Sequence, residues 1–198
     1  MQQPKVVVFG GVNGARKTTV ANEILRGVLN VPVFTNSDAI ARGLNALSVE
    51  SVAFKASRVM LEWMNELVEE RQDFAFETTL AARSYANWHK RFKSVGYRVY
   101  LYYYWLPSAD VAVARVKQRV IRGGHHIPEP DIRRRYCRSV DKFLRYYSTV
   151  ADVWEVYNDT GDERRLIAVG NLMNCEVDNE SDWKSFKESA NASQESSD

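Results

Sequence analysis

The chain has 198 residues, of which 45% are hydrophobic and 26% charged, and its formal net charge is +2 at pH 7. These values are typical of a soluble globular protein with one well-buried core. There is no apolar run near the ~18 residues of a membrane span, no signal-peptide core and no disulfide or zinc spacing between the two cysteines, so we expect a cytoplasmic protein without a membrane partner.

Strand and helix patterns alternate along the chain. Apolar, β-branched runs predict strands over 5–9, 31–35, 73–77, 98–106, 154–157 and 166–169. Helical periodicity predicts helices over 17–29, 50–70, 84–94 and 131–149, and one more that Ser108 caps and the Gly123-Gly124 pair ends. This alternation predicts an α/β fold with a parallel sheet flanked by helices on both faces.

Two details of this prediction concern the helix over 50–70 and the end of the chain. The inner face of that helix is predicted to contain Val52, Ala56, Val59, Met60, Trp63 and Leu67. From Glu176 to Asp198 the chain holds seven acidic and two basic residues, with no apolar periodicity. We therefore predict one folded domain over 1–178 and an acidic flexible tail over 179–198.

A phosphate-binding loop is predicted between the first strand and the first helix. The string Gly11-Val12-Asn13-Gly14-Ala15-Arg16-Lys17-Thr18 follows the pattern G-x-x-x-x-G-K-[ST] except at Arg16, where the pattern has glycine. In such loops backbone N–H groups hold phosphates, the lysine contacts the β and γ oxygens, and the hydroxyl holds magnesium. The predicted ATP contacts are Gly11, Asn13, Gly14, Ala15, Arg16, Lys17, Thr18 and Thr19, with Thr18 as the Mg²⁺ ligand.

Arg16 leaves two interpretations of this loop open. Glycine at a sharp turn adopts backbone angles that strain other residues, so we expect Arg16 to weaken ATP binding and Arg16→Gly to tighten it about tenfold. The alternative is a loop that has lost nucleotide binding, in a protein that is not a catalyst.

Acidic and polar side chains follow the second and third predicted strands. Asp38 comes just after one and Glu77 ends the other, so both are expected at the rim where parallel sheets bind ligands. Asp38 is a candidate base for an attacking hydroxyl, or else a helix cap. Glu77, Thr79 and Arg83 fit a sugar-like substrate or an outer-shell magnesium contact; the alternative is a Glu77–Arg83 ion pair.

Ten Lys and Arg residues lie between Arg115 and Arg145, against three acidic residues. Arg115, Arg119 and Arg122 share one helical face, and Arg133, Arg134, Arg135 and Arg138 follow the glycine break. We predict an arginine-lined helical lid over about 119–138 that closes on triphosphate. A solvated basic face or a nucleic-acid surface is the alternative, but few aromatic residues interleave and no nucleic-acid motif is present.

These strings together resemble the zeta toxin family of bacterial toxin–antitoxin systems, from about Val6 to Ala168. The resemblance rests on Gly-Val-Asn-Gly-Ala-Arg-Lys-Thr-Thr, Asn-Ser-Asp-Ala-Ile-Ala-Arg-Gly, Phe-Glu-Thr-Thr-Leu-Ala-Ala-Arg-Ser-Tyr, Gly-Gly-His-His-Ile-Pro-Glu and Arg-Arg-Tyr-Cys-Arg-Ser. It implies a P-loop NTPase kinase with an adenylate-kinase-like core that uses ATP and Mg²⁺. It also implies a small-molecule substrate such as a UDP-amino sugar, and an antitoxin as candidate partner.

The resemblance also implies roles for residues. Lys17 and Thr18 match the ATP and magnesium contacts, Asp38 the base, and Glu77, Thr79 and Arg83 the substrate contacts. The lid arginines correspond to Arg119 and one of Arg134 or Arg135; we assign Arg119 and Arg135, with Lys17 and Asp38, to catalysis and Arg134 to nucleotide binding. A kinase for another hydroxyl, on an antibiotic, a sugar or a nucleic-acid end, remains an alternative.

Overall fold

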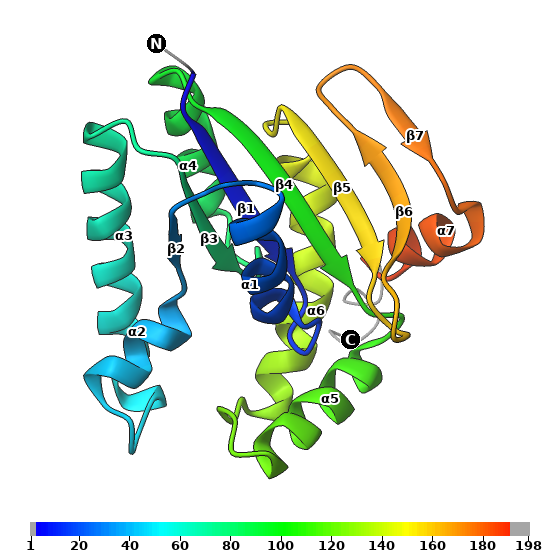
Figure 1. Ribbon diagram of the computed structural model, residues 1–198. Coiled ribbons are helices and arrows are strands. Elements are labelled where there is room, and N and C mark those ends of the chain that lie inside the picture. Colours follow the sequence, from blue (N-terminus) through cyan, green and yellow to red (C-terminus); the bar gives the residue numbers. More distant parts are fainter. Residues whose placement is uncertain (1–2, 191–198) are drawn as a thin grey trace.

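The computed structural model describes residues 3–190, apart from the side chains of Arg26 and Ser84. One seven-stranded sheet in the order β2-β3-β1-β4-β5-β6-β7 forms its centre (Figure 1). The first five strands run parallel, and β6 and β7 are added antiparallel. The strands are β1 (Lys5–Gly11), β2 (Val33–Thr35), β3 (Phe74–Thr78), β4 (Arg98–Trp105), β5 (Val153–Asn158), β6 (Arg165–Gly170) and β7 (Cys175–Val177).

Helices follow the parallel strands, as the alternation predicted. In Figure 1, α1 lies in front of the sheet, α4 and α6 lie behind it, and α2 and α3 stand at the β2 edge. The α-helices are α1 (Lys17–Gly27), α2 (Ser37–Leu44), α3 (Ala53–Glu69), α4 (Ser84–Ser94), α5 (Ala109–Ile121), α6 (Glu129–Lys142) and α7 (Glu180–Glu188), with a 3-10 turn at Glu50–Val52 and a π-helical turn at Phe143–Tyr147. No helix in the described part of the chain is long and apolar enough to span a membrane.

Side-chain alternation along β4 divides the core into two layers. Tyr102 and Tyr104 face the α1 side, where the Phe9 ring lies 6.0 and 6.5 Å from their rings. Tyr103 faces the opposite side and contacts the rings of Phe143 at 4.7 Å and Phe186 at 5.5 Å. Both faces of the central strand are thus buried, which is why it is apolar and aromatic almost throughout.

The predicted flexible tail is wrong for residues 180–188, which form α7. Asn179 caps this helix by accepting a hydrogen bond from the Asp182 N–H at 2.8 Å. Phe186 is completely buried, and Trp183 stacks on Trp154 with ring centroids 6.1 Å apart. The segment has few apolar residues, so its sequence shows no clear helical pattern. In the structure Trp183 and Phe186 are the residues of α7 that pack against the core. The rest of the predicted tail, residues 191–198, lies outside the described residues.

The inner face of α3 is rotated relative to the prediction. Ala56, Met60 and Leu67 are buried as predicted, and Met64 is buried with them. Val59 and Trp63, however, are 36% and 41% exposed. Val68 is buried as well, so the buried strip of α3 is shifted away from Val59 and Trp63 towards Met64 and Val68.

Candidate active site

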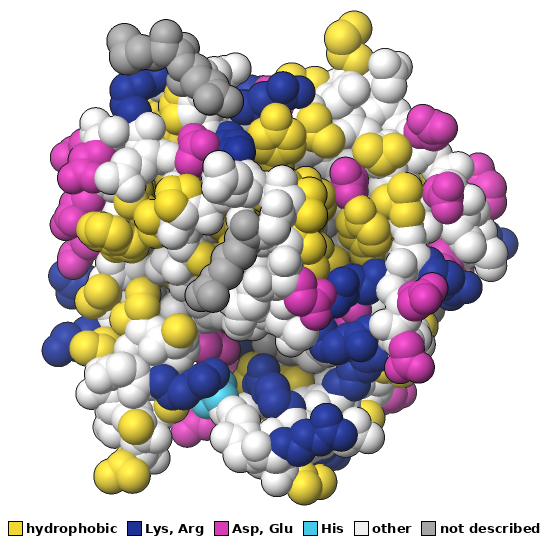
Figure 2. Space-filling model, viewed as in Figure 1, with side chains coloured by type: hydrophobic (Ala, Val, Ile, Leu, Met, Phe, Trp, Pro, Cys, Tyr) yellow, Lys and Arg dark blue, Asp and Glu magenta, His cyan; other side chains and the backbone are white. Residues whose placement is uncertain are grey.

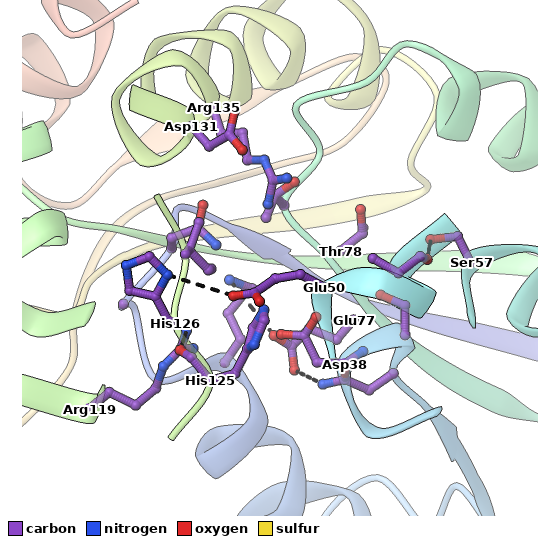
Figure 3. Close-up of a pocket in the computed structure, with 18 of the residues that line it drawn as sticks. Asp38, Glu50, Ser57, Glu77, Thr78, Arg119, His125, His126, Asp131 and Arg135 are labelled. Atoms are coloured by element: carbon purple, nitrogen blue, oxygen red, sulfur yellow. Dashed lines mark hydrogen bonds and ion pairs between the residues drawn. The ribbon is translucent and has the colours of Figure 1, made fainter. Parts of the chain in front are cut away.

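The carboxyl ends of β1 and β3 open onto a cavity of about 480 Å³ (Figure 3). In a parallel sheet this edge gathers the loops that follow neighbouring strands, so residues distant in sequence meet here. The wall includes three residues of the predicted phosphate loop, together with residues from α2, α3, β3, α5 and α6. Its polar and charged lining residues are Asn13, Lys17, Asn36, Ser37, Asp38, Glu50, Ser57, Glu77, Thr78, Thr79, Tyr85, Arg119, His125, His126, Asp131 and Arg135.

Lys17 is the buried cation of this cavity. Its side chain is only 6% exposed, and its Nζ donates to the Val12 carbonyl at 2.9 Å and lies 3.8 Å from Glu77 Oε1. Burial lowers the pKa of Lys17, and the carboxylates of Glu77 and Asp38 oppose that effect. A desolvated ammonium at the start of a helix is a site that a polyanion such as triphosphate would stabilise.

Glu77 is held among residues of the phosphate loop and α2. The Thr18 hydroxyl donates to Glu77 Oε2 at 2.5 Å and the Asn36 amide donates to the same oxygen at 2.7 Å. Glu77 therefore forms no ion pair with Arg83, whose guanidinium instead lies 4.6 Å from the Tyr146 ring centroid and outside the cavity lining. This position places Glu77 at the predicted magnesium end of the cavity.

Asn36, and not Asp38, caps α2. The Asn36 side chain caps α2 by accepting hydrogen bonds from the N–H groups of Asp38 and Ala39, at 2.8 and 3.4 Å. Asp38 is thus free of the capping role, and its carboxylate lines the cavity without a hydrogen bond or ion pair to any described residue. An unpaired carboxylate can accept a proton from a substrate hydroxyl. Sequence reasoning overlooked Asn36, although asparagine is a favoured N-cap residue.

Two of the predicted lid arginines enter the cavity from different helices (Figure 3). Arg119 lies in the last turn of α5, where its Nη2 donates to the His125 carbonyl at 2.7 Å. Arg135 comes from α6. Arg134, in contrast, pairs with Asp131 at 2.6 Å and is not part of the lining. The structure thus separates the two alternatives that the sequence left open: Arg135 reaches the cavity.

The remaining loop residues have mixed positions. Gly11 has φ 133°, and a Cβ there would lie 2.1 Å from the Tyr104 carbonyl oxygen, so close packing requires glycine. Asn13 and Gly14 line the cavity. Ala15 is buried in the core and Thr19 is exposed on α1, and neither lines the cavity. Arg83, a predicted substrate contact, does not line it either.

Arg16 has left-handed backbone angles, φ 34° and ψ 26°, which glycine adopts without strain and arginine does not. The cost of such a conformation is about 1–3 kcal/mol. Its side chain turns away from the cavity and bonds to Asp159, with Nε to Oδ2 at 3.0 Å and Nη2 to Oδ1 at 2.9 Å. These charge-assisted hydrogen bonds raise the pKa of Arg16.

Several lining residues were absent from the sequence-based site. Glu50 lies in the 3-10 turn that precedes α3, Ser57 lies in the second turn of α3, and His126 is 3.6 Å from Glu50. Tyr85 of α4 completes this wall. Helical periodicity could identify the buried face of these helices but not a second, cavity-facing strip. The His125-His126 pair was the best available signal, because it lies in the loop between the arginine helices.

The cavity suits ATP and Mg²⁺. Asn13 and Arg119 line it, and each has one buried polar atom, Oδ1 and Nε respectively, without a hydrogen-bond partner among the described residues. Over the described residues, no three His, Cys, Asp or Glu side chains converge as a metal cage. Mg²⁺ is commonly held by one or two protein oxygens together with substrate phosphates and water, and the Thr18 hydroxyl and the Glu77 carboxylate bring two such oxygens within 2.5 Å of each other.

Comparison with known proteins places this site in a family context. The family model described as Zeta toxin matches residues 1–168. An uncharacterized Haemophilus influenzae protein is 28% identical over 136 residues, which cover 69% of this chain and 95% of that protein.

Two groups of solved structures share the fold. A chain of the AvrRxo1-ORF1:AvrRxo1-ORF2 complex with ATP superposes with a TM-score of 0.71 and 15% identity, covering 93% of this chain; this chain spans only 64% of its length. A chain of the PezAT chromosomal toxin-antitoxin system of Streptococcus pneumoniae has a TM-score of 0.66 and 14% identity, covering 98% of this chain and 88% of that one. The predicted α/β fold, a mostly parallel sheet flanked by helices, is confirmed.

Proposed function

We propose that this chain, which belongs to the zeta toxin family, is an ATP-dependent P-loop kinase that transfers the γ-phosphate of ATP to a hydroxyl of a small molecule. One observation supports this most strongly. A buried lysine, an unpaired carboxylate and two arginines from separate helices, Lys17, Asp38, Arg119 and Arg135, line a single cavity. A protein that only bound nucleotide would need no unpaired carboxylate beside the phosphate site.

In the proposed reaction the phosphates lie between the loop and the two lid arginines. Lys17 and Arg119 stabilise the negative charge on the transferring group, and Arg135 acts from the opposite wall. Asp38 accepts the proton of the acceptor hydroxyl while the oxygen of that hydroxyl bonds to the γ-phosphorus. The bond from that phosphorus to the bridging oxygen breaks, and ADP leaves.

Thr18 and Glu77 are the proposed protein contacts for Mg²⁺. When bound, the ion neutralises charge on the β- and γ-phosphates. Thr18 would supply its hydroxyl oxygen, and Glu77 would act through water, since its carboxylate already accepts from both Thr18 and Asn36. Of the two roles that the sequence left open for Glu77, we therefore propose the outer-shell magnesium contact.

The proposed acceptor binds between α2, α3 and the lid. That wall contains Ser57, Thr79 and Tyr85 together with Asp38 and Glu50, a set of hydroxyls and carboxylates suited to a sugar-like polyol. A UDP-amino sugar is the first acceptor to test because of the family membership. The relatedness to toxin–antitoxin structures also makes an antitoxin protein a proposed partner.

The proposal is tested in two steps. Calorimetric titration of the wild-type chain with MgATP should show binding, and MgATP should raise its melting temperature. An acceptor screen with γ-labelled ATP should then include UDP-N-acetylglucosamine, simple sugars, aminoglycosides and a 5′-hydroxyl oligonucleotide. Label in one small molecule supports the kinase proposal. Binding of MgATP with release of free phosphate only, unchanged by every acceptor, contradicts it.

A further inference from the structure

Asp159 is a fully buried carboxylate outside the cavity, and it contacts three arginines. It follows β5 directly, and its backbone N–H donates to the Trp105 carbonyl at 3.0 Å, which fixes it to the end of β4. Its side chain is 0% exposed. Arg16 and Arg115 bond to it at 2.9 and 3.0 Å, and Arg164 lies 3.6 Å away.

The contact with Arg16 is a two-point clamp. Two guanidinium nitrogens bond to the two carboxylate oxygens, and Nη2 also donates to the Gly161 carbonyl at 2.6 Å. This geometry fixes the direction of the side chain as well as its position. The turn that ends the phosphate loop is therefore attached, through Arg16, to the end of the parallel sheet.

The contact with Arg115 attaches the lid helix to the same carboxylate. Arg115 also donates to the Thr160 carbonyl at 2.6 Å. It lies one helical turn before Arg119 on α5 and beside the loop, since a Cβ on Gly14 would lie 3.1 Å from the Arg115 Cβ. Dark blue side chains gather where α1, α5 and the β5–β6 turn meet in Figure 2.

We propose that Asp159 is a positioning residue that holds the phosphate loop in its binding conformation by clamping Arg16. Elsewhere in such loops glycine adopts the left-handed conformation freely; here the buried carboxylate imposes it on an arginine. The inference rests on the proposed function, because it concerns ATP binding by the same loop. It also changes the expectation for Arg16→Gly. The Arg16 side chain contacts Asp159 and is not part of the cavity lining, so we assign the cost of the strained conformation to folding, and Arg16→Gly removes no phosphate contact.

The test is a double-mutant cycle on MgATP affinity, measured by calorimetry, with Asp159→Asn, Arg16→Gly and the double variant. Asp159→Asn keeps the shape of the side chain but removes the charge. In the presence of Arg16 it should weaken MgATP binding about tenfold or more. Arg16→Gly alone should stay within about threefold of wild type, and adding Asp159→Asn to it should change the affinity by less than threefold.

Arg164→Gln is the matched control. It removes a guanidinium that lies near the Asp159 carboxylate but does not belong to the phosphate loop. The MgATP affinity of this variant should equal that of wild type. The free energy of unfolding of each variant is measured without nucleotide, to distinguish general destabilisation from a local effect on the loop. General destabilisation by Asp159→Asn would be similar with Arg16 and with Arg16→Gly. An equal loss of MgATP affinity from Asp159→Asn with and without Arg16, or no loss at all, overturns the clamp. MgATP binding without phosphate transfer overturns the kinase proposal and leaves the clamp intact.

Discussion

The Thr18 hydroxyl donates a 2.5 Å hydrogen bond to the Glu77 carboxylate, linking the first turn of α1 to the end of β3. Thr18 lies beside the buried Lys17, whose ammonium is 3.8 Å from the other Glu77 oxygen. One carboxylate thus contacts both the cation and the hydroxyl of the phosphate loop. This relationship is the basis for proposing a magnesium role for Glu77 in place of an acceptor role.

Replacing Glu77 by Gln should raise the Mg²⁺ concentration needed for half-maximal transfer. Removing an outer-shell partner typically weakens metal binding about 10–100-fold, while Gln keeps the size of the side chain. The measurement is a Mg²⁺ titration of the transfer rate at saturating ATP. Glu155→Gln is the control, because that carboxylate lies on β5 outside the cavity lining. An unchanged Mg²⁺ requirement with a raised acceptor KM would assign Glu77 to the acceptor instead.

Arg119→Ala and Arg135→Ala should lower kcat much more than they raise the Kd for ATP. A lid arginine that stabilises the transferring phosphoryl group can contribute up to about 10³–10⁵-fold to kcat. Arg133→Ala is the matched control, because Arg133 pairs with Glu129 and Asp110 outside the cavity. If both cavity variants keep wild-type kcat and only make nucleic-acid binding more salt-sensitive, the basic block serves nucleic acid.

His89 should make the fold sensitive to mild acid. It is completely buried among the Phe76, Phe92 and Tyr147 rings, and neither ring nitrogen has a hydrogen-bond partner. Burial lowers its pKa from 6.5 to about 3. Below pH 6.5 His89 is therefore protonated in the unfolded chain and neutral in the folded chain. The free energy of unfolding consequently falls as the pH falls from 6.5 towards about 3.

The loss amounts to about 1 kcal/mol per pH unit below 6.5, or about 2 kcal/mol between pH 7 and pH 5. Urea unfolding at pH 7 and pH 5 measures it. His89→Phe, which has no titrating group, should reduce the difference between the two pH values by that amount. An identical pH dependence in the wild type and the variant would show that His89 contributes nothing to it.

The sequence was sufficient for the parallel strands and for the longer helices that follow them, but the short helix α2 was not among the helices predicted. The apolar runs of the strands and the 3.6-residue periods of the longer helices are local signals, and the phosphate loop is a contiguous string. The antiparallel addition of β6 and β7 was not predictable from such signals, because pairing direction depends on which edge is free. Helix α7 was missed because Trp183 and Phe186 alone supply its buried face.

The charged residues at the centre of the candidate site could be predicted from the sequence, but the contacts that hold the phosphate loop in place could not. Lys17, Asp38 and Arg119 could be found because residue type and position after a strand or on a helix face are visible in the sequence. The Asp159–Arg16 contact could not be found, since the two residues are 143 positions apart and nothing local marks them as partners. In the sequence Arg16 is only a departure from the loop pattern, whereas in the structure it is the residue that links the loop to Asp159.

The most direct test of the account is the rate of phosphate transfer by Asp38→Asn. Asp38 is proposed to accept the proton of the acceptor hydroxyl and to make no contact that holds ATP, so transfer and ATP binding should respond differently to its replacement. With the acceptor identified in the screen, the transfer rate from γ-labelled ATP should fall about 10²–10⁴-fold. The Kd for MgATP should remain within about threefold of wild type. A transfer rate within threefold of wild type would contradict the assignment of a hydroxyl kinase site to this cavity.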